Sequence, residues 1–147
     1  QELLSSFDTI LNIITAFLIG VASISLLVGS IGIANTMYTS VLERTKEIGT
    51  MKAVGAKNSD VLWIFLIESG LLGAVGGFIG MSLGLGISKL VELIAIQSLG
   101  TDLLRAATPY WLVIGCVLFG FIIGSVSGGL PAYQASRLKP VDALRYE

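Results

Sequence analysis

Three long apolar stretches dominate the pattern of hydrophobic and polar positions along this chain. They run over residues 10–42, 61–96 and 110–133, and polar residues gather in the segments between and after them. Each stretch reaches or exceeds the ~20 apolar residues that a helix needs to cross the hydrocarbon of a bilayer. Backbone groups in lipid must be paired within their own segment, so the pattern predicts an all-α membrane protein with three long transmembrane helices.

The composition agrees with a chain embedded in a membrane. Of the 147 residues, 54% are hydrophobic and 13% are charged, and the mean hydropathy is +0.87. A soluble domain of this length has too small a core to hide so much apolar surface, whereas a bilayer accepts it around every helix. The net charge of −1 argues against a nucleic-acid-binding surface. We expect one multi-pass transmembrane domain over residues 1–147, in the lipid bilayer of a cell membrane.

Catalytic and metal-binding chemistry finds little support in the sequence. Histidine is absent and the one cysteine, Cys116, lies in an apolar run, which argues against a zinc site and an intrachain disulfide. No Gly-Lys pair occurs, so the phosphate-binding loop of an ATPase is missing. Neither a nucleophile with its base nor a pair of catalytic acids can be assembled. We therefore expect no enzyme activity and no cofactor in this chain.

Lysine and arginine predict which side of the membrane each segment faces. They gather in the polar segment 43–60 and in the tail 134–147, while the segment 97–108 has only Arg105 and the residues before the first stretch have none. Connections rich in these residues stay in the cytoplasm. We therefore expect the N-terminus and the 97–108 loop outside, and the 43–60 segment and the tail in the cytoplasm.

Glycines recur at four-residue spacing within the second and third stretches and form ridges of small residues along the predicted helices. Such ridges let helix backbones approach closely. Two explanations are open, packing between the spans of one chain and a dimer face for a second copy. The glycines concerned are Gly73, Gly76, Gly77, Gly80, Gly84, Gly120, Gly124 and Gly128.

The polar segment between the first two stretches predicts a short amphipathic helix. Ile48, Met51 and Val54 recur at three-residue spacing, with charged residues before and between them. Gly55 is suited to end this helix in a left-handed conformation, and residues 58–60 can cap the next one. Such a helix docks on another protein, lies on lipid headgroups or forms a solvated turn. Its balanced charges argue against simple attraction to anionic lipid.

Two motifs lie at the two segments expected in the cytoplasm. The first comprises Glu43, Arg44, Lys46, Glu47, Ile48, Gly49, Met51, Lys52, Ala53, Gly55 and Ala56. The second comprises Pro131, Ala132, Ala135, Arg137, Leu138, Pro140, Ala143, Leu144 and Arg145. Joined by the glycine-rich spans, they cover nearly the whole chain and resemble the FtsX-like, or MacB-like, permease family of ABC transporters.

The resemblance implies that the 43–60 segment holds a coupling helix, which docks into a cleft of an ATP-binding subunit that carries ATP and Mg. Two permease copies, alike or different, would work with two such subunits. Motion would pass along the long helices to an extracytoplasmic domain, a mode called mechanotransmission. Family members usually have four spans with that domain between the first two, so this sequence resembles their C-terminal region. The residues implied to contact the ATPase are Glu43, Arg44, Lys46, Glu47, Lys52 and, as buried anchors, Ile48 and Met51. The predicted partner-binding set also includes Gly49, Ala53 and Gly55 of the same motif.

Glu68 is an acidic residue well inside the second stretch. A carboxylate at such depth is costly unless it is paired. We expect it near the inner interface, paired with a basic residue such as Arg44 or Lys52. A latch between helix ends and an ion-coupling site are the alternatives, and the second lacks a further buried acid or base.

The sequence thus favours the permease subunit of an ABC transporter that acts as a mechanical transmitter. The alternative is a small membrane scaffold or regulatory protein that docks a soluble partner through the same segment without transport. A channel or exchanger needs polar residues along a path, for which one Glu68 is thin support. A requirement for an ATPase separates the first hypothesis from the second.

Overall fold

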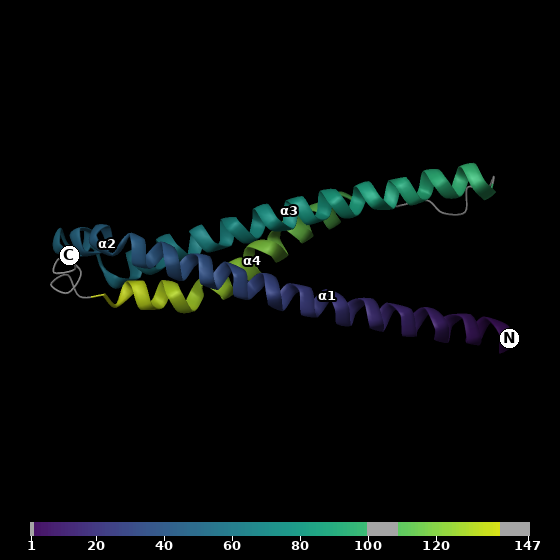
Figure 1. The fold of residues 1–147 in the computed structure, drawn as a ribbon, viewed down its shortest axis with the longest axis horizontal. Coiled ribbons are helices and arrows are strands. Elements are labelled where there is room, and N and C mark those ends of the chain that lie inside the picture. The colour runs from purple at the N-terminus through teal and green to yellow at the C-terminus, as the bar shows by residue number, and fades with distance from the viewer. Residues whose placement is uncertain (1, 100–108, 139–147) are drawn as a thin grey trace. The chain divides into compact units, whose positions relative to one another are not determined.

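Four helices make up the part of the chain that the computed structural model describes, residues 2–99 and 109–138, with side chains at 5–97 and 109–138. No strand occurs among these residues, and three of the helices are long and apolar enough to cross a membrane. The prediction of an all-α membrane protein with three long spans is confirmed, and a short helix follows the first span as expected. In chain order the helices are α1 Glu2–Glu43, α2 Thr45–Ala53, α3 Asn58–Leu99 and α4 Tyr110–Ser136 (Figure 1).

The long helices extend beyond the apolar stretches that predicted them, at both ends of α1 and α3 and at the C-terminal end of α4. A helix pairs its backbone groups internally, so it does not have to stop where the apolar residues stop. Hydroxyl side chains within the spans are paired in the same way. Thr9 Oγ1 donates to the Ser5 carbonyl at 2.7 Å, and Ser23 Oγ donates to the Ile19 carbonyl at 2.8 Å. Such bonds to the preceding turn let serine and threonine fit an apolar helix.

The predicted loop after the second span and the predicted tail after the third lie largely outside the described residues. Of the 97–108 loop, residues 97–99 belong to α3 and residues 100–108 are not described. Of the 134–147 tail, α4 takes the residues up to Ser136, and the description ends at Leu138.

The chain divides into two units within α1. The first unit ends at Gly32 and consists of the N-terminal part of α1. Every described side chain from Ser5 to Gly29 is exposed in it. An apolar helix with no covered face is typical of a segment surrounded by lipid or by other helices.

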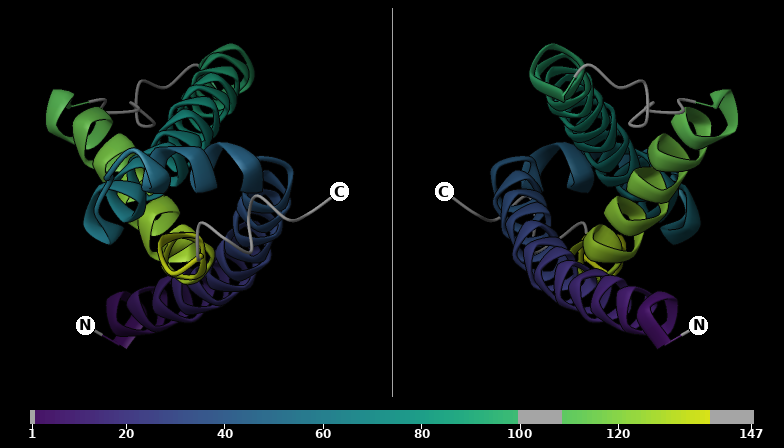
Figure 2. Two further views of the ribbon diagram at one scale, coloured as in Figure 1. Left: turned by 90° about the vertical axis from the view of Figure 1, so that its left-hand side faces the viewer. Right: turned by 90° about the vertical axis from the view of Figure 1, so that its right-hand side faces the viewer.

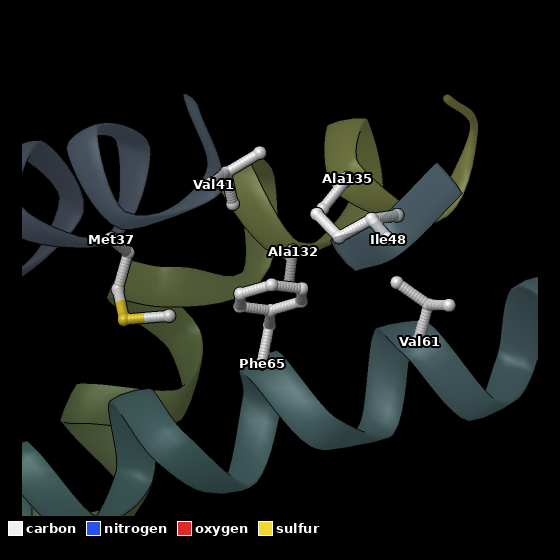
Figure 3. Packing of buried hydrophobic residues seen from close by; sticks show 7 residues of the cluster. All are labelled: Met37, Val41, Ile48, Val61, Phe65, Ala132 and Ala135. Atoms are coloured by element: carbon white, nitrogen blue, oxygen red, sulfur yellow. The ribbon is translucent and has the colours of Figure 1, made fainter. Parts of the chain in front are cut away.

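The second unit, from Ile33 onward, has a small core to which all four helices contribute. Figure 3 shows its buried side chains, Met37 and Val41 of α1, Ile48 of α2, Val61 and Phe65 of α3, and Ala132 and Ala135 of α4. The ring of Phe65 faces the small side chain of Ala132, which lets α3 and α4 come close. Full burial of one isoleucine or phenylalanine contributes about 1.5–3 kcal/mol. This core holds α2 and the adjoining ends of the long helices together.

The backbones of α3 and α4 touch where glycines of the two helices face each other, and the helices diverge toward Leu99 and Tyr110 (Figure 2). A Cβ atom added to Gly73 would lie 2.8 Å from the Gly124 Cα atom and closer still to the Gly120 carbonyl oxygen. Packing between the spans of one chain therefore accounts for these ridges. The glycines at the contact are Gly70, Gly73, Gly77, Gly120, Gly124 and Gly128.

One of the predicted ridges, formed by Gly76, Gly80 and Gly84 at four-residue spacing, has no such neighbour. A Cβ atom added to any of these residues would meet no described atom within 4 Å. Because α4 covers the Gly73 side of α3, this ridge points elsewhere. Packing within the second unit does not account for it, and a face for a second copy stays a prediction.

Candidate functional site

The short turns on either side of α2 have paired polar groups. At its start, Thr45 Oγ1 donates to the carbonyls of Val41 and Leu42, at 3.0 and 2.8 Å. Before α3, the Lys57 N–H donates to Asp60 Oδ2 at 3.0 Å, one of the capping contacts that the sequence allowed. Side-chain bonds of this kind satisfy groups that helix ends leave unpaired. These bonds stabilise the two turns that connect α2 to α1 and to α3.

The C-terminus of α2 closes in a glycine turn. Gly55 has a φ of 113°, which an L side chain rarely adopts. Its N–H donates to the Lys52 carbonyl at 3.1 Å, and the Ala56 N–H donates to the Met51 carbonyl at 3.0 Å. This pair of bonds is the Schellman motif, which satisfies the last helical carbonyls. The prediction that Gly55 ends this helix is confirmed.

The side chain of Ile48 points into the chain's own core. It is 0% exposed and lies toward Val61 of α3 and Ala135 of α4 (Figure 3). Its neighbour Gly49 is buried too. The expectation that Ile48 anchors α2 in a partner's groove is therefore corrected: the residue anchors α2 to its own helices, because none of its surface is accessible.

The side of α2 that faces away from the other helices, which we call its outer face, has an apolar surface. Val54, the C-cap residue that follows Ala53, is 91% exposed. With Thr50, Met51 and Ala56 it lines a shallow groove of about 400 Å³, which we call the α2 groove. Met51 also packs against the buried core, so it belongs to both sides. The predicted set of partner-binding residues omitted Val54, the most exposed apolar side chain of this segment.

The predicted partner-binding residues differ in their exposure. Ile48 and Gly49 are buried, and Met51 and Lys52 are half-buried. The rest are open to a partner. These exposed residues are Glu43, Arg44, Lys46, Glu47, Ala53 and Gly55.

Lys52 does not belong to the outer face. Its Nζ donates to Asn58 Oδ1 at 2.8 Å, to the Ser136 carbonyl at 2.5 Å and to the Leu138 carbonyl at 2.8 Å. These acceptors lie at the start of α3 and at the end of α4. The ammonium group is thus directed into its own chain, and contact of Lys52 with the ATPase stays a prediction.

Glu68 pairs with Arg44, as one of the two expected partners. The Arg44 Nη1 atom lies 3.3 Å from Glu68 Oε1 and 3.4 Å from Oε2. The two side chains are 50% and 32% exposed. The pair links the turn before α2 to α3, which agrees with a latch between helix ends. No group of acidic or cysteine side chains that could hold a metal ion occurs elsewhere among the described residues.

The described part of the tail motif contributes buried residues of α4 to the core. Pro131 and Ala132 are buried inside α4, and the Arg137 guanidinium lies 4.8 Å from the centre of the Tyr133 ring. The motif residues Pro140, Ala143, Leu144 and Arg145 lie outside the described residues.

Comparison with known proteins decides the family. A family model described as FtsX-like permease C-terminal matches residues 19–140. The chain belongs to the FtsX-like permease family. The matched range contains α2, the glycine contact of α3 with α4, and the tail motif as far as Pro140.

Relatives of this FtsX-like permease are named as ABC transporter permeases. An uncharacterised ABC transporter permease of Methanocaldococcus jannaschii is 42% identical over 147 residues, all of this chain and 37% of that protein. One of Bacillus subtilis is also 42% identical over 147 residues, again all of this chain and 35% of that protein. The macrolide export ATP-binding/permease protein MacB of Bdellovibrio bacteriovorus is 44% identical over 147 residues, all of this chain and 21% of that protein. The chain thus spans between about a fifth and about two fifths of these relatives.

Breaking the Arg44–Glu68 pair of this permease will have a small effect on stability. In a double-mutant cycle of Arg44→Gln and Glu68→Gln, we expect a coupling energy of about 0.2–1 kcal/mol, because the Arg44 side chain is exposed and that of Glu68 is only half-buried. Unfolding followed by tryptophan fluorescence at two salt concentrations measures it, and salt will weaken the coupling. A coupling above about 2 kcal/mol that salt does not change would instead indicate a shielded pair.

Proposed function

We propose that this chain is the membrane part of an ABC transporter of the mechanotransmission type. An ATP-binding partner docks on the outer face of α2, and its ATP-driven motion passes through the long helices to an extracytoplasmic region for efflux, extraction or signalling. ATP and Mg are bound, and ATP is hydrolysed, on the ATP-binding partner. The name of the MacB relative joins "ATP-binding" and "permease" in one protein, which supports a direct link between the two activities.

The observation that carries this proposal is the two-sided character of α2. One side is fixed to the helix bundle through Ile48, which is 0% exposed, and the other offers the α2 groove beside Val54, which is 91% exposed. A helix whose only task was to connect two spans would gain nothing from an exposed apolar side chain next to a groove. An apolar side chain of a partner would remove that surface from water.

Exposed charged residues on and just before α2 can set the register of docking. Lys46 and Glu47 are both exposed on α2, and Glu43 precedes it. Charges at the rim of an interface add specificity and speed association more than they add affinity. In this proposal apolar contact at Val54 and Met51 supplies the affinity, and the charges select the partner.

The distribution of lysine and arginine supports the orientation that docking requires. Segment 43–60 holds four of these residues, while the 97–108 loop holds Arg105 alone. Retention of such segments in the cytoplasm would place α2 on the side where ATP is available. The N-terminus would then lie outside and the C-terminus in the cytoplasm. A second permease copy, identical or different, completes the assembly that family membership suggests.

Placing a charge on the α2 groove will weaken partner binding without unfolding the permease. For Val54→Asp in the full-length protein in nanodiscs, we expect affinity for the purified ATP-binding partner to fall about tenfold to a hundredfold, since an apolar contact would be lost and a carboxylate desolvated. The melting temperature will stay within about 2 °C, because Val54 makes few contacts to lose.

The matched control is Ser59→Asp, which adds the same charge at another exposed position of the segment, outside the groove. Its affinity for the partner should equal that of the wild type. Equal binding by wild type and Val54→Asp would refute docking at this groove. Binding that survives while ATP changes nothing in the permease would favour the scaffold hypothesis over mechanotransmission.

A further inference from the structure

One side chain of α2 joins the ends of two other helices. Lys52, in the last turn of α2, places its ammonium group on three acceptors. Two are the carbonyls of Ser136 and Leu138, at the end of α4, and the third is the side chain of Asn58, the first residue of α3. A lysine ammonium has three N–H donors and no acceptor. All three donors of Lys52 are therefore used within this chain.

The position of these acceptors explains why a cation is favoured there. The last carbonyls of a helix lack intrahelical partners and carry the negative end of the helix dipole. Ser136 is the last residue of α4 and Leu138 lies just beyond it. The ammonium thus satisfies one such carbonyl, that of Ser136, and a second carbonyl just past the helix end, that of Leu138, and it balances the partial negative charge there.

The surroundings separate Lys52 from the other lysines of the segment. Lys52 is half-buried, and Ala135 and Ser136 next to its acceptors are 0% and 4% exposed. Lys46 and Lys57 are exposed. Lys52 is therefore part of the packed helix bundle, whereas the α2 groove is open to a partner.

We propose that Lys52 is a positioning residue that makes the end of α4 follow α2. The inference rests on the proposed function, in which the partner pushes or pulls on α2. Ile48 holds the middle of α2 in the core, and Arg44 ties the turn before it to Glu68 of α3. Lys52 supplies the polar link from α2 to the carbonyl end of α4. Without that link, the apolar contact of Ile48 toward Ala135 is what remains between α2 and α4, and less of the motion of α2 reaches the end of α4.

A lysine suits this junction better than an arginine does. The three acceptors converge on one atom, Nζ, within 2.5–2.8 Å. A compact ammonium can direct its donors to three separate points, whereas the donors of a guanidinium lie in one plane. A role that required positive charge alone would be kept by arginine, so Lys52→Arg tests the geometry.

Hydrogen exchange on the full-length permease in nanodiscs tests the proposal, with wild type compared with Lys52→Met, Lys52→Arg and the control Lys57→Met. Without any partner, we expect the amides of residues 133–138 to exchange about tenfold faster in Lys52→Met than in wild type, because the end of α4 loses the ammonium group that caps it. In Lys52→Arg the same amides should also exchange faster than in wild type. Lys57→Met removes the same charge from an exposed site and should match the wild type. Unchanged exchange across the middle of α3 verifies that each variant is folded.

The second arm adds the ATP-binding partner, with and without ATP. In wild type and Lys57→Met, we expect ATP to change exchange at residues 45–58 and also at 133–138. In Lys52→Met, partner affinity should stay within about threefold and the response at 45–58 should remain, while the response at 133–138 falls by at least about half, because the core contact of Ile48 is kept. This separation would not follow from a general loss of stability.

Three results would overturn the inference. If ATP changed exchange at residues 133–138 as much in Lys52→Met as in wild type, Lys52 would not be needed to couple α2 to α4, and the proposed function would still stand. Loss of partner binding in Lys52→Met would assign Lys52 to the docking surface. A wild type that does not bind the partner would reject the proposed function, and with it the transmission role of Lys52.

Discussion

Ile48→Asp will destabilise the second unit of the permease by about 3–5 kcal/mol, far more than the same substitution at Val54. The Ile48 side chain is 0% exposed between α2, α3 and α4, so aspartate would leave a void and bring a carboxylate into an apolar cluster. The residues of that cluster carry no basic group that could pair with it. The melting temperature in detergent, followed by tryptophan fluorescence, measures the loss.

Val54→Asp is the matched control, since it makes the same chemical change six residues further on, at a side chain that is 91% exposed. We expect its melting temperature to stay close to that of the wild type. Faster proteolysis within residues 43–60 of Ile48→Asp would locate the damage at α2. If both variants melted together near the wild-type temperature, Ile48 would not hold α2 in the core, and docking of Ile48 on a partner would again be open.

The different environments of Ile48, Met51 and Val54 follow from helix geometry. Successive residues of an α-helix turn by about 100°, so a three-residue step falls about 60° short of a full turn. Relative to Ile48, Met51 is therefore rotated by about 60° and Val54 by about 120°. The structure has this gradient, with Ile48 buried, Met51 half-buried and Val54 exposed. The even spacing suggested one apolar face where there are two.

The sequence alone left open which of these faces meets the partner. Apolar runs of at least ~20 residues point to membrane spans because lipid requires internally paired backbone. A nine-residue amphipathic helix carries no such constraint, since its apolar side fits a foreign groove as well as its own bundle. The core that takes up Ile48 is built from α1, α3 and α4, and the contributing alanines of α4 lie more than eighty residues further along the chain.

Lys52 and Glu68 show the same limit for polar residues. Glu68 needed a nearby cation, and Arg44, in the turn before α2, was one of the two basic residues expected to pair with it. That pairing was predictable because few cations were available at that depth. The acceptors of Lys52 include backbone carbonyls 84 and 86 residues away. Every residue has a backbone carbonyl, so the sequence does not indicate which carbonyls accept a hydrogen bond from this lysine. Its inward role therefore had to come from the fold.

The glycine ridges were recognisable from their spacing, but α3 carries two of them on different sides. Gly73 and Gly77 form one, and Gly76, Gly80 and Gly84 form the other. Both satisfy the same small-residue pattern. Which ridge meets α4 depends on how the two helices are rotated, and only the first meets it.

This difference allows a sharp test with one methyl group. Gly73→Ala places a Cβ atom 2.8 Å from the Gly124 Cα atom and closer to the Gly120 carbonyl oxygen, so α3 and α4 must separate. We expect a loss of about 1–3 kcal/mol or more, because neither contact is with a side chain that could move aside. Thermal unfolding of the purified permease measures it.

Gly76→Ala is the control three residues along the same helix, where an added Cβ atom meets no described atom within 4 Å. There the methyl group should be neutral or should stabilise α3 by up to about 1 kcal/mol, because alanine favours a helix more than glycine does. Opposite signs for the two variants would establish that the Gly73 ridge brings the spans together. Equal melting temperatures would show that α3 and α4 do not touch at Gly73, and would leave the core around Ile48 as the contact that joins them.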